Sequence, residues 1–128
     1  MDEFDIPIFK KNYELYKLLN SMRASIPKQD RYVVWQRVEN TNLDVTELIL
    51  HATALYKTEK LPVLDQASVK LNLLRFLIRL SYDTKAIDGK KYTAIQQQID
   101  EIGRMLGGWI KSLKTENTQN APLQGASQ

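Results

Sequence analysis

The side chains best suited to chemistry in this sequence are basic. Arg75 and Arg79 lie four residues apart in one apolar segment, so on a helix they share a face and repel each other unless an anion bridges them. Guanidinium groups in such a pair suit phosphate oxygens. We therefore predict that the pair contacts a nucleic acid. An ion pair between subunits, for example to Asp44 or Glu47, is the structural alternative.

A second polar set repeats every seven residues near the C-terminal end. Its neighbours would stand about 10 Å apart along one side of a helix. Phosphate contacts from such a ridge would give sequence-tolerant, salt-sensitive binding. The alternative is that the ridge only solvates the outside of the fold. The residues are Lys90, Gln97, Arg104 and Lys111.

The sequence offers little for catalysis. His51 is the single histidine and cysteine is absent, so no Ser/His or Cys/His nucleophile–base pair can be assembled. Asp44 and Glu47 share a helix face but are interpreted as solvated charges, and no acidic cluster has the spacing of a metal site. We expect a protein that is not an enzyme, with no catalytic residue, metal or cofactor. A nuclease that uses His51 is the remote alternative.

The charge balance favours an acidic partner. The 128 residues carry 18 Lys and Arg against 15 Asp and Glu, a formal net charge of +3. Four of the acids, Asp2, Glu3, Asp5 and Glu116, flank the helical part. The span 6–114 therefore holds 18 basic residues against 11 acidic ones, a net of +7. Nucleic acid is the first candidate partner, and a positive bias for solubility is the alternative.

Composition also bears on the compartment. Without cysteine there is no disulfide or thiol chemistry, which fits a reducing compartment. The start "MDEFDIP" is acidic and lacks the apolar run of a secretory signal. Arg75 and Arg79 interrupt the longest apolar stretch, "LNLLRFLIRL", well short of a membrane span. We expect a cytoplasmic protein with no membrane partner.

Hydrophobic spacing predicts four helices and no strands. Pro27 ends the first helix, and Asp30 is a plausible N-cap for the second. Pro62 can occupy the first turn of the third, and Asp88 caps the fourth. The expected ranges are 8–24, 31–57, 62–85 and 89–114.

Short connections make successive helices antiparallel neighbours. The predicted fold class is an all-α, up-down antiparallel four-helix bundle over residues 8–114. Residues 1–7 form an acidic leader. Residues 115–128 are polar and predicted to be a disordered tail.

The third helix is expected to be apolar on two nearly opposite sides. One stripe suits the core of the bundle: Leu64, Ala67, Leu71, Leu74, Ile78 and Ser81. The other would be exposed in a monomer, and contiguous apolar surface usually marks an interaction site. We interpret it as the interface of a homo-oligomer; burial of both sides within one chain is the alternative. It consists of Val69, Leu73, Phe76 and Leu80.

The segment "EIGRMLGGWIKSL" places three glycines in a helix, each at a cost of about 1 kcal/mol relative to alanine. Gly103 and Gly107 are four residues apart, so another backbone could approach closely there. Trp109 continues the apolar pattern beyond them. We predict that Gly103, Gly107 and Trp109 are helix-packing residues. The alternative is that the pair Gly107 and Gly108 loosens a fraying helix end.

Three stretches resemble a known family: "EIGRMLGGWIKSL", "LDQASVKLNLLRFLIRLSYDTKAI" and "SIPKQDRYVVWQRV". They are similar to the accessory variability determinant proteins of diversity-generating retroelements. The resemblance covers residues 9–114 and is strongest over 61–114. Small proteins encoded in intervening sequences of bacterial ribosomal RNA genes share the same bundle.

The resemblance implies a barrel-like homopentamer of four-helix bundles with a basic surface. It also implies binding to a reverse transcriptase and to its template RNA, in a complex whose adenine-mutagenised cDNA replaces a variable region of a target gene. The accessory protein would not be the polymerase. The alternative is a structural oligomer of the intervening-sequence type, without a reverse-transcriptase partner.

Site residues follow from the same resemblance. Arg75, Arg79 and Arg104 align with basic positions of the family motifs and are expected to contact RNA or cDNA. Lys70 and Lys111 are weaker candidates for the same contact.

Overall fold

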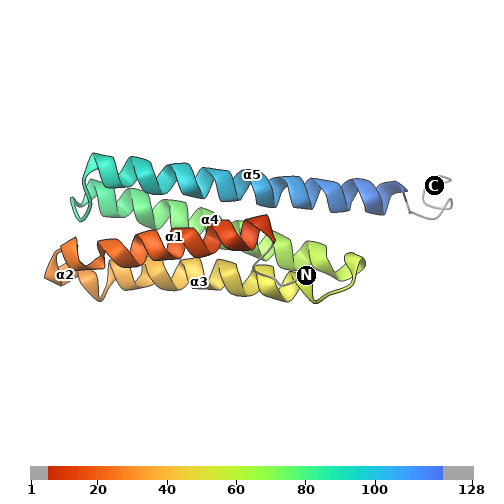
Figure 1. The fold of residues 1–128 in the computed structure, drawn as a ribbon, viewed down its shortest axis with the longest axis horizontal. Helices are drawn as coiled ribbons and strands as arrows, with labels where there is room; N and C mark the ends of the chain where they lie inside the picture. The colour runs from red at the N-terminus through yellow and green to blue at the C-terminus, as the bar shows by residue number, and fades with distance from the viewer. Residues whose placement is uncertain (1–5, 120–128) are drawn as a thin grey trace.

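The computed structural model describes residues 6–119, and over this range the chain forms helices and connecting turns without strands. Four long helices lie side by side and alternate in direction, α1 with α3, α3 with α4, α4 with α5, and α5 with α1 (Figure 1). The predicted all-α helical bundle is confirmed. The elements are α1 (Pro7–Met22), η2 (Arg23–Ser25), α2 (Lys28–Arg31), α3 (Val34–Thr53), α4 (Lys57–Asp83) and α5 (Gly89–Gln119).

The first connection differs from the prediction. After Pro27 the chain forms the one-turn helix α2, in which the Asp30 and Arg31 amides donate to the Pro27 carbonyl at 2.9 and 3.0 Å. Asp30 therefore lies inside α2 and does not cap the second long helix. That helix, α3, follows Val33 at its N-cap and receives no side-chain cap.

Of the other two predicted helix starts, that of α4 differs from the structure and that of α5 agrees with it. Pro62 was expected in the first turn, but α4 begins at Lys57 and encloses it. Proline has no backbone N–H to donate. Near a helix start this leaves one early carbonyl without its helical hydrogen-bond donor. Asp88 does cap α5, because its Oδ1 accepts the Lys91 amide at 2.9 Å.

The last helix is longer than predicted. α5 continues to Gln119, five residues past the expected end, and Glu116 pairs with Lys57 at the start of α4 at 2.5 Å. Residues 1–5 of the predicted leader and 120–128 of the predicted tail lie outside the described residues.

The core is apolar and continuous along the bundle axis. Every residue of the predicted core stripe of α4 is buried, Ser81 included, whose hydroxyl donates to the Leu77 carbonyl at 2.8 Å. Trp35 is fully buried and donates its indole N–H to the Leu19 carbonyl at 3.1 Å. Over residues 6–119 no helix reaches the length and apolarity that a membrane crossing requires.

Candidate subunit and nucleic-acid interface

The second apolar side of α4 faces away from the bundle. Val69 and Phe76 are 68% and 63% exposed, Leu80 is 39% exposed, and Leu73 is half-buried. Because the core stripe of α4 occupies the opposite side, no helix of residues 6–119 covers the outer one. The alternative that both sides are buried within one chain is therefore wrong. These four residues are called the α4 strip below.

A groove of about 360 Å³ runs between α4 and α5, beside the α4 strip. Its α4 wall carries Ser68, Asn72 and Arg75, and its α5 wall carries Asp100 and Arg104. The floor includes two glycines where side chains would otherwise stand, Gly103 and Gly107. The groove thus has two glycines in its floor and an arginine on each wall.

Arg75 crosses this groove. Its Nη2 lies 3.2 Å from Asp100 Oδ1, and a Cβ built on Gly103 would stand 2.6 Å from the same nitrogen. The glycine therefore leaves room for a guanidinium group of its own chain, where a second backbone was expected. Arg75 is two-thirds buried as a result, with its charge opposed by Asp100.

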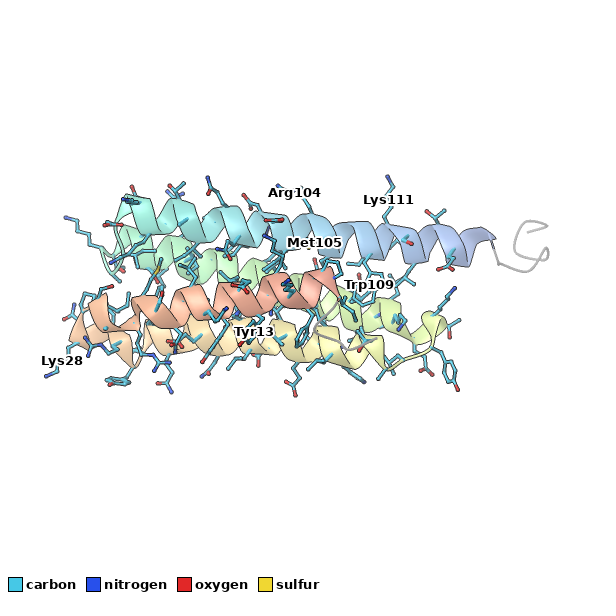
Figure 2. The ribbon with its side chains drawn as sticks, in the orientation of Figure 1. Tyr13, Lys28, Arg104, Met105, Trp109 and Lys111 are labelled. Carbon is cyan, nitrogen blue, oxygen red and sulfur yellow. The ribbon has the colours of Figure 1, made fainter. Side chains whose placement is uncertain are left out.

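The other glycines have open surroundings. A Cβ at Gly107 or Gly108 would meet nothing within 4 Å, so no helix of the described residues packs on them. The helix also does not end there, which contradicts the fraying alternative. Trp109 is half-buried against the core and lines a different, apolar groove with Met105 and Ile6 (Figure 2).

Two further predicted contact residues have carboxylate partners. Arg79 Nε donates to both carboxylate oxygens of Asp83, at 3.0 and 3.1 Å, and this hydrogen bond and charge raise the pKa of Arg79. Lys70 Nζ lies 3.2 Å from Asp44 Oδ2. The anions that neutralise Arg75, Arg79 and Lys70 thus come from the same chain, whereas the structural alternative for Arg75 and Arg79 placed their partners on another subunit.

Arg104 and Lys111 remain without an ion pair over the described residues. Both are exposed and project from the outer side of α5 (Figure 2). Lys90, at the same helical spacing, is also exposed and unpaired there. Of the five residues expected to contact nucleic acid, the two on α5 are the ones whose charge is available without breaking an intrachain pair.

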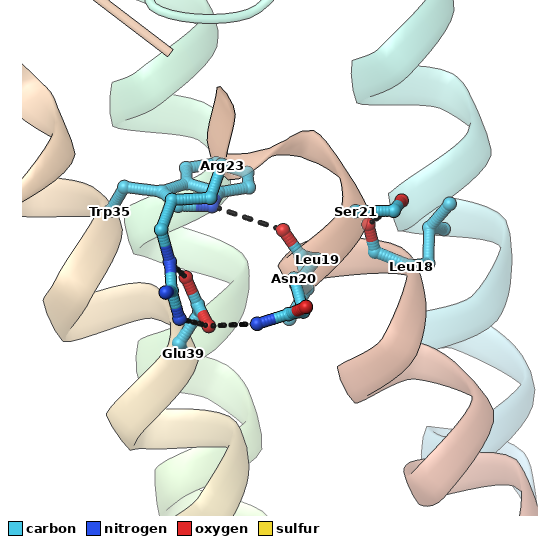
Figure 3. A network of polar contacts seen from close by, with 7 residues as sticks. All are labelled: Leu18, Leu19, Asn20, Ser21, Arg23, Trp35 and Glu39. Atoms are coloured by element: carbon cyan, nitrogen blue, oxygen red, sulfur yellow. Dashed lines mark hydrogen bonds and ion pairs between the residues drawn. The ribbon is translucent and has the colours of Figure 1, made fainter. Parts of the chain in front are cut away.

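A buried polar network between α1 and α3 was not predicted from the sequence (Figure 3). Glu39 is 3% exposed and accepts from Arg23 Nε at 2.7 Å and from Arg23 Nη2 at 2.5 Å. Asn20 Nδ2 also donates to it, at 3.4 Å. The Glu39 hydrogen bond raises the pKa of Arg23. A signal was present, because Glu39 lies four residues after the buried Trp35 and so shares its side of the helix.

A second missed network joins the middle of α1 and α3. Asn12 Nδ2 donates to the Asn42 carbonyl at 3.3 Å, and Asn42 Nδ2 returns the bond to the Asn12 carbonyl at 3.4 Å. The Asn12 amide also contacts the Thr46 hydroxyl. Asn12 stands four residues after Ile8, in the apolar stripe of the first helix, which is where a buried amide could have been suspected.

The candidate catalytic residues are not brought together. His51 is exposed near the end of α3, and Asp44 is engaged with Lys70. Among residues 6–119 no three histidine, cysteine or carboxylate side chains are grouped as a metal site would need.

The fold and this face define a class of protein: an all-helical bundle whose outer features are an apolar strip and unpaired cations. The bAvd-like family model matches residues 7–113, and the chain belongs to that family. The match agrees with the resemblance to accessory variability determinant proteins, and the family is of an accessory, non-catalytic type. No curated protein matches the chain closely enough to count as a relative.

Proposed function

We propose that this protein is a non-catalytic accessory subunit of a diversity-generating retroelement. In this role it binds the reverse transcriptase and its template RNA or cDNA, and so supports mutagenic reverse transcription and retrohoming. It acts in the cytoplasm as a homo-oligomer, a barrel-like pentamer. Family membership supports the role, and the observation that carries the assembly is the exposed α4 strip beside the basic α4–α5 groove.

The arrangement gives the two features complementary tasks. A second copy of the chain covers the α4 strip, because apolar side chains as exposed as Val69 and Phe76 lower the free energy of association when they are buried. The α5 cations then remain on the outside of the assembly. Repeated around a ring, Arg104 and Lys111 form a positive belt that contacts phosphates without reading sequence.

Arg75 and Arg79, which already form ion pairs within the chain, contribute less to nucleic-acid binding. Exposed ion pairs contribute little to folding stability, so a phosphate can replace Asp83 at Arg79 at small cost. Arg75 is two-thirds buried beside Asp100, so the same exchange costs more there. We therefore place Arg104 and Lys111 first in nucleic-acid contact, and Arg75, Arg79 and Lys70 behind them.

A test of the contact uses the double variant Arg104→Ala/Lys111→Ala in the full chain. It is expected to keep its helical circular dichroism and its solution mass but to lose most RNA retention at low salt, with a shallower dependence of binding on salt. The matched control, Lys10→Ala/Lys85→Ala, removes two exposed charges that form no ion pair among residues 6–119 and should retain RNA. Equal RNA retention by the two double variants would reject the site.

The pairing of Arg75, Arg79 and Lys70 within the chain favours a second candidate. In it the protein is a structural oligomer of the ribosomal-intervening-sequence type, with no reverse-transcriptase partner. The gene neighbourhood separates the two. A nearby reverse-transcriptase gene, with a template repeat and a variable repeat that differ at adenines, supports the retroelement role, and its absence supports the structural one.

A further inference from the structure

A small polar pocket lies on the opposite side of the bundle from the α4–α5 groove, between α1 and α3. Its volume is about 170 Å³, which suits one planar ring system and excludes a helix or a folded partner. It is lined by Tyr16, Arg23, Arg31, Tyr32, Gln36, Glu39 and Asn40. None of these residues belongs to the α4 strip or to the α5 ridge.

Two tyrosines supply aromatic surface that the fold does not use. Tyr32 follows α2 and is 68% exposed, and Tyr16 reaches the pocket from α1. Neither phenol makes a hydrogen bond within the described part of the chain. An aromatic side chain left exposed beside a pocket offers a stacking surface for a planar ligand.

The pocket edge carries uncommitted hydrogen-bonding groups. The side-chain amides of Gln36 and Asn40, both on α3, form no hydrogen bond among residues 6–119. Each amide offers donors and an acceptor, which is the mixed pattern found on the edge of a nucleobase.

The Arg31 guanidinium is held by two hydrogen bonds, but one of its N–H groups has no acceptor among the described residues. Arg31 Nη2 donates to the Ala24 and Ile26 carbonyls, both at 3.1 Å, and these bonds hold the guanidinium plane. Its Nε is buried and has no partner in the described residues. Arg31 also lines the pocket and pairs with no carboxylate among residues 6–119, so its charge is available to an acceptor on a ligand.

The charge balance favours a base over a bare phosphate. Glu39 binds both the Nε and Nη2 of Arg23 and so cancels its charge. Only Arg31 remains as a positive group, whereas anion sites gather several cationic or backbone donors. Aromatic rings and free amides around one cation match a nucleobase attached to a single phosphate.

We propose that this α1–α3 pocket binds one unstacked base of a single-stranded nucleic acid, with Tyr32 as the stacking surface, Gln36 and Asn40 on the base edge, and Arg31 at the attached phosphate or a base acceptor. The proposal rests on the nucleic-acid binding of the proposed accessory role and adds a base-binding site on the other side of the bundle. It also stands independently of the α5 ridge.

The test titrates the full chain with AMP and UMP by calorimetry, and with ribose 5-phosphate and inorganic phosphate as probes that lack the base. The nucleotides should bind at least about tenfold more tightly than ribose 5-phosphate, because stacking is lost without a base. Ribose 5-phosphate or inorganic phosphate binding as well as AMP would overturn the proposal, since the pocket would then be an anion site. No saturable binding of AMP up to about 10 mM would overturn it too.

Variants then locate the site. Tyr32→Ala and Gln36→Ala should each weaken AMP binding, Tyr32→Ala by about fivefold or more, and both should fold because neither side chain makes a structural hydrogen bond. The matched control is Tyr56→Ala, which removes an 81% exposed tyrosine just before α4, at the other end of α3. Unchanged AMP binding in Tyr32→Ala would overturn the proposal.

Comparison with the ridge variants separates this proposal from the accessory role. Arg104→Ala/Lys111→Ala should lose RNA retention while it binds AMP normally. Loss of AMP binding in that double variant would place the nucleotide on α5 and overturn the pocket assignment.

Discussion

At the level of single residues, the glycines of α5 differ in what surrounds them. Gly103 lies under the Arg75 guanidinium, whereas Gly107 is open on its outer side. Both lower the intrinsic stability of the helix. Among residues 6–119 only Gly103 has a neighbour that explains it, and in the proposed homo-oligomer the open glycine would lie close to the surface of another copy.

This difference predicts gains in stability of different size for two matched substitutions. Gly107→Ala should raise the free energy of unfolding of the isolated chain by up to about 1 kcal/mol, because the added Cβ meets nothing and the helix gains propensity. Gly103→Ala should gain less, since its Cβ displaces Arg75 from Asp100. Urea unfolding at a concentration where the chain is monomeric measures both. A larger gain for Gly103→Ala would contradict this interpretation of the groove.

At the level of elements, the end of α4 is closed by a residue in an unfavourable conformation. Lys85 has a φ of 67°, in the left-handed region, and its amide donates to the Tyr82 carbonyl at 3.0 Å. The Ala86 amide donates to the Ser81 carbonyl at 2.8 Å. This is the geometry that glycine adopts most readily at a helix C-terminus.

Lys85→Gly should therefore stabilise the protein by about 0.5–1 kcal/mol, because it relieves the positive φ while the helix-ending hydrogen bonds remain. The matched control, Lys90→Gly, removes the same charge inside α5 and should not stabilise. Thermal unfolding by circular dichroism compares the two. A lower midpoint for Lys85→Gly would show that its side chain matters more than the backbone.

Features that depend on the order of residues along one helix could be predicted from the sequence. The period of the apolar residues located the core stripe of α4, and the Asp88 cap followed from its neighbours, because both depend on local order along the chain. The start of α4 was misplaced because Pro62 was taken as a boundary, although a proline near a helix start is tolerated.

Pairings across helices could not be predicted in the same way. Arg75 meets Asp100 and Lys70 meets Asp44, each about 25 residues away in sequence. Helix rotation and register decide such contacts, and spacing along one helix does not contain that information. For the same reason the α1–α3 pocket was not predicted, since its walls come from α1, the α2 turn and α3.

At the level of the whole molecule, the bundle buries an apolar core but leaves apolar side chains exposed on the outer side of α4. The core is closed by α1, α3, α4 and α5, yet α4 also presents Val69 and Phe76 to the solvent. Two other exposed leucines, Leu43 and Leu50, are 44% and 40% exposed on α3 and do not adjoin that strip. They provide a control of similar chemistry on another surface.

We expect the unmodified chain to have a solution mass that is a multiple of 14.8 kDa, and Val69→Glu/Phe76→Glu to be a folded 14.8 kDa monomer. Two carboxylates in the α4 strip would have to lose their hydration in a subunit interface, at a cost that association cannot offset. Leu43→Glu/Leu50→Glu adds the same charge on α3 and should leave the mass unchanged. Light scattering with circular dichroism measures mass and folding together. If the unmodified chain is a monomer at micromolar concentration, the α4 strip is not a subunit interface and the ring of α5 cations cannot form.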